Sequence, residues 1–136
     1  MPNPENRDSV YLYRIQGYCE RILQYLDLLQ YEYQVFLGKQ YMVDAIGMNL
    51  FQIGELAGRL SEPFRQATCD RMPWQRMKSM RNMFAHNYAH ADLETIWNTA
   101  VENIPPLLAF CREQLAADPL MQEIQSSCQS PEEIDL

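Results

Sequence analysis

The feature that most constrains this chain is a set of apolar residues near the N-terminus that recur at alternating spacings of three and four. This spacing places them on one face of a helix of roughly six turns. Asp8 or Ser9 is expected to cap the start of this helix, because either side chain can accept hydrogen bonds from first-turn amides. The apolar positions are Leu12, Ile15, Cys19, Ile22, Leu26 and Leu29.

The next segments predict a second helix from about Lys39 to Leu60. Over residues 31–37 before it, polar and apolar side chains alternate locally as they do in a strand. An isolated strand has no pairing partner, so we predict a loop or a segment that leads into the helix. Gly47, Gly54 and Gly58 fall on one face of the second helix. Glycine weakens a helix, so three aligned glycines indicate close approach by another backbone. The residues expected to point inward are Met42, Ile46, Ile53, Leu56 and Leu60.

Further helices are predicted after a short turn-and-helix link over residues 61–68. Pro73 suits the first turn of a third helix, because its missing N–H is not needed there. Residues 85–91 show little periodicity and predict a helix end or loop, after which Asp92 is expected to cap a fourth helix. The apolar positions of these two helices are Trp74, Met77 and Phe84, then Leu93, Ile96, Trp97, Ala100, Val101 and Ile104.

Pro105 and Pro106 must break or kink the fourth helix, because proline clashes with the preceding turn. A fifth helical stretch then carries Leu107, Leu108, Cys111 and Leu115. The predicted fold class is all-α, an antiparallel bundle of four to five helices. We expect one helical domain over residues 1–117 and an acidic, loosely ordered tail over residues 118–136.

Composition and cysteine spacing narrow the functional classes. The 136 residues fit one domain, and four scattered cysteines favour reduced thiols over a disulfide framework or a zinc site. With only His86 and His90 as histidines, no metal site is expected. No apolar run is long enough to cross a bilayer, and the N-terminus lacks the apolar core of a signal peptide. The expected location is the cytoplasm.

The charge of the chain is unevenly distributed. The net charge is −7, which is unfavourable for general nucleic-acid binding. Residues 59–81, however, hold six basic and two acidic side chains, whereas residues 92–136 hold one basic and nine acidic ones. The basic segment is either a solvated charge run or a positive surface that leads into a site.

One short stretch, Arg81-Asn82-Met83-Phe84-Ala85-His86-Asn87-Tyr88, combines residue types that suit RNA cleavage. Histidine can act as acid or base near neutral pH, and arginine offers paired donors to phosphate oxygens. On a continuous helix Arg81 and His86 would be about 140° apart. They can therefore meet only if the helix ends between them, or if two copies of the chain face each other.

This stretch resembles the R-x4-H-x-Y motif of the HepT-like branch of the HEPN superfamily. The flanking segments agree in the same order: NLFQIGELAGRLSE, MPWQRMKSMRNMFAH and ADLETIWNTAVENIPPLL. The resemblance covers roughly residues 8–116. It implies a homodimeric, metal-independent endoribonuclease that acts on RNA as the toxin of a toxin–antitoxin pair and uses no cofactor.

The resemblance also implies roles for individual residues. Arg81 and His86 correspond to the catalytic pair at the dimer interface, and Asn82 to a supporting polar position. Tyr88 corresponds to the tyrosine to which a minimal nucleotidyltransferase antitoxin of the MntA type transfers AMP from ATP, which silences the toxin. Asn87 replaces a glycine that is common after the motif histidine, and His90 is extra, so the local loop geometry departs from the family pattern.

Two features outside the motif have alternative interpretations. Arg7, Tyr11, Arg14, Tyr18, Arg21 and Tyr25 form an alternating stripe on the first predicted helix. The stripe is either a cation–π ladder with tyrosines at the edge of the core, or a face for RNA or a partner. Glu55 is either exposed, or a buried carboxylate that orients the Arg81 guanidinium and so supports the site.

Two functional hypotheses follow. The first is a ribonuclease toxin, which the Arg81/His86 pair favours. The second is a non-catalytic HEPN-type dimer that binds a nucleotidyltransferase partner or a nucleotide, which the acidic net charge favours.

Overall fold

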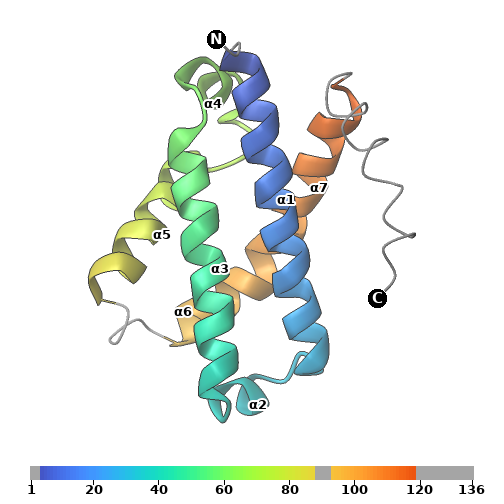
Figure 1. The fold of residues 1–136 in the computed structure, drawn as a ribbon. Coiled ribbons are helices and arrows are strands. Elements are labelled where there is room, and N and C mark those ends of the chain that lie inside the picture. The colour runs from blue at the N-terminus through green and yellow to red at the C-terminus, as the bar shows by residue number, and fades with distance from the viewer. Residues whose placement is uncertain (1–3, 88–92, 119–136) are drawn as a thin grey trace, which may run out of the picture.

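The computed structural model describes residues 4–87 and 93–118, without the side chains of residues 4–6, 80 and 82–87. In these residues the chain is helical and contains no strand, as the predicted all-α class requires. The helices α1, α3 and α5 run in alternating directions, and the segment from α6 to α7 returns toward the start of α1 (Figure 1). The elements are α1 (Pro4–Leu28), α2 (Tyr33–Leu37), α3 (Gln40–Arg59), α4 (Glu62–Thr68), α5 (Trp74–Asn87), α6 (Leu93–Asn98), the π-helical turn η2 (Thr99–Asn103) and α7 (Ile104–Ala116).

Helix α1 buries the predicted apolar face completely, but its start differs from the prediction. The helix begins at Pro4, so Asp8 and Ser9 lie inside it and do not cap it. The buried Asp8 carboxylate accepts from the backbone N–H of Ser61 at 2.7 Å and from the Ser61 hydroxyl, and the Ser9 hydroxyl donates to Asp118. The cap prediction was wrong because both polar side chains have partners in other parts of the fold.

The segment over residues 31–37 contains the short helix α2, so the rejection of a strand was correct. Phe36 is fully buried, and its ring lies 5.1 Å from that of Trp97, centroid to centroid. Tyr33 packs on the same indole at 5.7 Å. These rings join α2 to α6. Figure 1 shows these two helices toward the same end of the molecule.

At the opposite end, contacts around the start of α5 fix its position. The Ser61 hydroxyl caps α4 by accepting from the Phe64 N–H at 3.3 Å, which confirms the predicted link helix. The indole N–H of Trp74 donates to the Thr68 hydroxyl at 2.8 Å, and its ring packs edge-on against Phe110 at 5.7 Å. Helix α5 is thereby joined at its first residue to both α4 and α7.

The proline pair acts as predicted, but the helical path continues across it. Proline lacks the N–H that closes a helical turn. Just before Pro105, the chain widens into the π-helical turn η2, and α7 starts with the two prolines in its first turn. Ile96, Ala100 and Ile104 remain buried along this path, as expected.

Neither a membrane span nor a disulfide occurs in the described part of the chain. No helix there is long and apolar enough to cross a membrane. Cys19, Cys69 and Cys111 are free thiols, as predicted. Helix α7 ends at Ala116, and residues 119–136 of the predicted tail lie outside the described residues, so the domain limit at residue 117 stays a prediction.

Candidate active site

The site begins with an unusually close contact between α3 and α5. A Cβ atom added to Gly54 would lie 2.9 Å from the carbonyl oxygen of Met77 and 3.1 Å from the backbone nitrogen of Arg81. A side chain at this position would therefore collide with the backbone of α5. The predicted close approach is confirmed at Gly54, whereas a Cβ atom at Gly58 would meet only the Lys78 side chain at 3.7 Å.

Glu55, the residue directly after Gly54, contacts the motif arginine, Arg81. An oxygen of Glu55 lies 3.3 Å from Nε of Arg81 in a salt bridge between α3 and α5. The side chains are 28% and 47% exposed, respectively. The interpretation that Glu55 orients Arg81 is thus supported by the contact, but the carboxylate is half-exposed and not buried. The guanidinium is exposed to solvent, so a phosphate group can also reach it.

The motif histidine lies on the same uninterrupted helix. Helix α5 runs from Trp74 to Asn87 and so includes both Arg81 and His86. Of the two arrangements left open by the sequence, a helix end between these residues is excluded. Their positions on the helix surface are about 140° apart. Asn82 follows Arg81 on α5, and Tyr88, His90 and Asp92 lie outside the described residues.

A small polar pocket adjoins the salt bridge on the outer side of α3. Its volume is about 260 Å³. In the described residues, the guanidinium groups of Arg14 and Arg59 form no ion pair, whereas Glu55 is held by Arg81. The lining residues are Arg14 from α1 and Phe51, Gln52, Glu55, Leu56 and Arg59 from α3.

A larger cavity of about 620 Å³ lies between the first turns of α5 and the segment α6–η2–α7. Ile53, Met77 and Leu107 belong to its apolar lining, and its charged lining residues are Arg71, Arg76 and Glu102. Arg81 and Glu55 do not line it. This cavity is therefore separate from the motif arginine.

The described residues contain no candidate metal site, and two of their three cysteines are buried. No group of three histidine, cysteine or acidic side chains there could hold a metal ion. Burial raises the pKa of the Cys111 thiol to about 12 and raises the pKa of Cys19 as well. Both thiols stay protonated near neutral pH, so they are core residues and not nucleophiles.

The stripe of arginines and tyrosines on α1 agrees in part with the first interpretation, a cation–π ladder with tyrosines at the edge of the core. Tyr11, Tyr18 and Tyr25 are half-buried against the core, and the guanidinium of Arg21 lies over the Tyr18 ring at 5.4 Å. Arg14 differs from this pattern because it lines the polar pocket.

Comparison with known proteins decides the family. The family model described as "Ribonuclease HepT-like" matches residues 15–114, which include the salt bridge and His86. The chain belongs to the ribonuclease HepT-like family. The resemblance seen in the motif and its flanking segments is thereby confirmed, and a ribonuclease activity is supported at the level of this HEPN-type family.

Individual relatives of this HepT-like chain agree with that assignment. A protein named "Putative RNase" from Caldanaerobacter subterraneus subsp. tengcongensis is 28% identical over 105 residues, covering 77% of this chain and 91% of the relative. One of the same description from Methanocaldococcus jannaschii is 26% identical, covering 76% and 84%. "Probable ribonuclease HepT" from Thermococcus cleftensis is 26% identical, covering 68% and 87%. No solved structure matches the chain.

Sequence reasoning did not assign Gln52 or Arg59 to a site. Arg59 was noted only as the first cation of the basic segment, although it follows Glu55 by four residues and so shares its face of α3. That spacing is the signal that could have identified it. The link to Arg14 had no such signal, because the two residues come from different helices.

Proposed function

We propose that this chain is the ribonuclease toxin of a toxin–antitoxin pair and cleaves RNA without a metal through Arg81 and His86. The observation that supports this most is the geometry of α5. Its exposed Arg81 guanidinium is held by Glu55, and His86 follows on the same helix within the matched family region. Asn82, next to Arg81, is proposed as a supporting polar residue of the same site.

The proposed chemistry uses these side chains directly. A histidine takes the proton of a ribose 2′-hydroxyl, and the 2′-oxygen attacks the neighbouring phosphorus. The bond from phosphorus to the 5′-oxygen breaks, and that oxygen receives a proton from a protonated histidine. The Arg81 guanidinium stabilises the negative charge that builds up on the phosphoryl oxygens. The products are a 2′,3′-cyclic phosphate end and a 5′-hydroxyl end.

Completion of this site requires a second copy of the chain. Because α5 is continuous, Arg81 and His86 of one copy lie too far apart around the helix to act on one phosphate. An isologous dimer would bring Arg81 of one copy toward His86 of the other.

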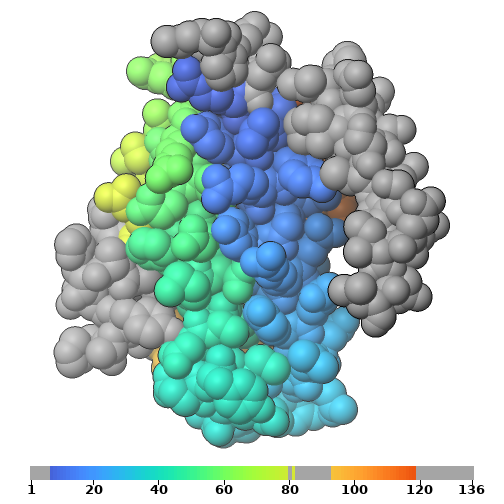
Figure 2. Space-filling model, viewed as in Figure 1, coloured from blue at the N-terminus to red at the C-terminus, as the bar shows by residue number. Residues whose placement is uncertain are grey.

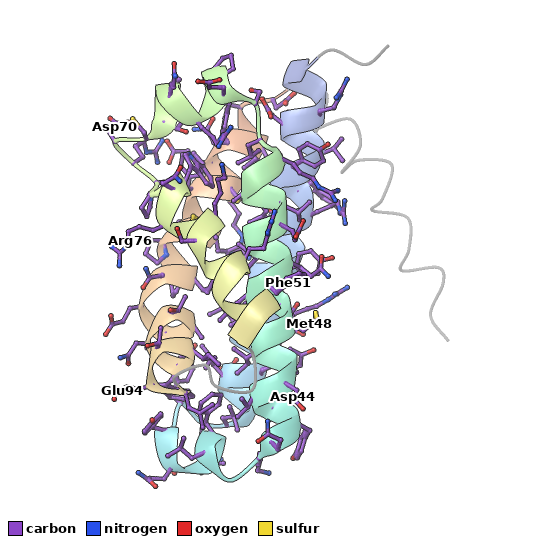
Figure 3. The ribbon with its side chains drawn as sticks, turned by 90° about the vertical axis from the view of Figure 1, so that its left-hand side faces the viewer. Asp44, Met48, Phe51, Asp70, Arg76 and Glu94 are labelled. Atoms are coloured by element: carbon purple, nitrogen blue, oxygen red, sulfur yellow. The ribbon has the colours of Figure 1, made fainter. Side chains whose placement is uncertain are left out.

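The outer face of α3 offers a surface for this dimer. Tyr41 and Met48 are 64% and 55% exposed, and with Glu55 they follow a spacing of seven residues. This spacing puts them on one stripe that leads to the Arg81 salt bridge. Figure 3 shows Met48 and Phe51 along this side of α3, beside the end of α5. A second copy packed here would meet the first next to the site.

Control of the site is proposed to act through Tyr88, directly after the end of α5 at Asn87. A nucleotidyltransferase partner would join the AMP of ATP to the Tyr88 hydroxyl and release pyrophosphate. The attached phosphate would occupy the position that Arg81 offers to RNA and would repel the incoming strand. Tyr88→Phe should keep most of the cleavage activity but should not gain the mass of AMP when incubated with the partner and ATP.

The decisive experiment compares two histidine variants. His86→Ala should lower the RNA cleavage rate by on the order of a hundredfold or more, because a general acid or base is lost. His90→Ala is the matched control and should retain cleavage. Chelation by EDTA should have no effect, and a strict requirement for a divalent ion would contradict the mechanism.

The second function, a non-catalytic dimer that binds a nucleotidyltransferase or nucleotide, is favoured by the net charge of −7. It predicts that wild type and His86→Ala cleave RNA at the same rate, which is no higher than the background rate without protein. The dimer itself is tested with Met48→Lys, which should sediment as a monomer and lose cleavage. Leu28→Lys, at a 71% exposed position near the end of α1, should leave the dimer intact.

A further inference from the structure

The polar pocket between α1 and α3 adjoins the proposed cleavage site, because the two share Glu55. Glu55 lines the pocket and also forms the salt bridge with Arg81. A ligand in the pocket would thus be separated from the motif arginine by one carboxylate. Figure 2 shows α1 and α3 side by side on the face turned toward the viewer.

The charges around the pocket favour an anion. Arg14 and Arg59 line it without an ion pair in the described residues, and Arg81 offsets the Glu55 carboxylate. The positions three and four residues from Arg14 on α1 hold Val10, Tyr11, Gly17 and Tyr18, so no carboxylate on its own helix face competes for it. Three guanidinium groups against one carboxylate leave two positive charges at this place on an acidic protein.

We propose that this pocket binds one phosphodiester and its ribose from single-stranded RNA, next to the bond that is cleaved. The inference rests on the proposed ribonuclease function and adds a binding subsite to it. Arg14 and Arg59 would hold the phosphate oxygens through planar paired donors. Gln52 would donate to a ribose hydroxyl or a base edge, and the half-buried Phe51 ring would form the apolar wall.

The size of the pocket supports a single nucleotide unit of an unpaired strand. Its volume of about 260 Å³ is below that of sites that enclose a whole drug-sized ligand, roughly 300–1,000 Å³. An A-form duplex presents its phosphates on a broad rigid surface, whereas a single strand can turn one unit into a recess. The subsite would therefore select single-stranded segments.

The test measures binding of a short single-stranded RNA whose 2′-hydroxyls are methylated, so that it cannot be cleaved. Arg14→Gln and Arg59→Gln should each weaken binding about tenfold, as expected for loss of a hydrogen bond to a charged group. Each should also reduce the slope of log affinity against log salt by about 0.7, the value for one phosphate contact on a single strand. Fluorescence anisotropy at several salt concentrations gives both quantities.

Arg21→Gln is the matched control, because Arg21 lies on the same stripe of α1 but does not line the pocket. It should bind the RNA as wild type does. An equal loss in Arg21→Gln would mean general attraction by the helix and would overturn the pocket. Equal binding of a duplex of the same sequence would also overturn it. Thermal unfolding of all three variants should match wild type, since these arginines are exposed.

Two outcomes separate this proposal from the catalytic one. In the first, Arg14→Gln and Arg59→Gln bind RNA normally but no longer form a complex with a nucleotidyltransferase. The pocket would then be a protein interface, and the RNA subsite would be overturned while the catalytic proposal stands. Undiminished cleavage by His86→Ala, together with weakened RNA binding by the two arginine variants, would overturn the catalytic assignment and support the subsite.

Discussion

Helices α1 and α5 pack against opposite sides of α3, but with different kinds of contact (Figure 1). Helix α1 contributes a full apolar face, in which Ile15, Ile22 and Leu26 have no exposed surface. Helix α5 meets α3 through its backbone at Gly54, and of its described side chains only Trp74, at its first residue, is buried. The α1 contact therefore stabilises the fold, whereas the α5 contact sets the position of Arg81 beside Glu55.

The largest effect on stability is expected on the α1 side. Ile22→Ala should lower the free energy of unfolding by about 2–5 kcal/mol, because it removes buried methyl groups and leaves a cavity. Chemical denaturation measures this change. Activity per folded molecule should remain close to wild type, since Ile22 lies far along α1 from the site. A loss of specific activity without loss of stability would contradict the division between the two contacts.

The next effect is expected at the glycine contact. Gly54→Ala places a methyl group 2.9 Å from the Met77 carbonyl oxygen, so α5 must shift. Overpacking costs about 1–3 kcal/mol, and the higher helix propensity of alanine offsets about 1 kcal/mol of that.

Cleavage by Gly54→Ala should fall far more than its stability. A displacement of about 1 Å at a catalytic group can lower the rate on the order of a hundredfold. Rate measurements on protein shown to be folded by circular dichroism check this. Full activity in Gly54→Ala would mean that the close contact does not position Arg81.

A smaller effect of opposite sign is expected one turn later on α3. Gly58→Ala should raise the free energy of unfolding by about 0.5–1 kcal/mol, because alanine favours the helix. The added methyl group would meet only the flexible Lys78 side chain at 3.7 Å, an ordinary contact. Cleavage should be unchanged, which makes this variant the matched control for Gly54→Ala. Destabilisation would show that α5 approaches α3 closely along a greater length.

The smallest effect is expected at the exposed ion pair before α5. Arg71 and Glu113 are 2.6 Å apart, and the hydrogen bond from Arg71 lowers the pKa of Glu113. A lowered carboxyl pKa adds stability at neutral pH, and that stability is lost as the pH falls through the folded-state pKa. Glu113→Gln should melt slightly below wild type at neutral pH and equally in acid. Salt should reduce the difference, and a difference that persists in acid would exclude the charge as its cause.

The sequence by itself determined the helix faces, the motif and the need for close packing on α3. Spacings of three and four residues identify the buried side of α1 because a helix repeats every 3.6 residues. Three aligned glycines indicate a close backbone neighbour, and the structure confirms this at Gly54. The motif residues Arg81, His86 and Tyr88 are recognised from residue type and order alone, and the family match over residues 15–114 includes their positions.

Only the tertiary structure decided which of these residues meet. The continuity of α5 through His86, the salt bridge from Arg81 to Glu55 and the pocket that joins Arg14 to Arg59 depend on how helices pack side by side. The same holds for Asp8, which was predicted to cap its own helix but bonds to Ser61, fifty-three residues away. Periodicity describes one helix at a time, and contacts between helices depend on side-chain shape and charge at positions distant in sequence.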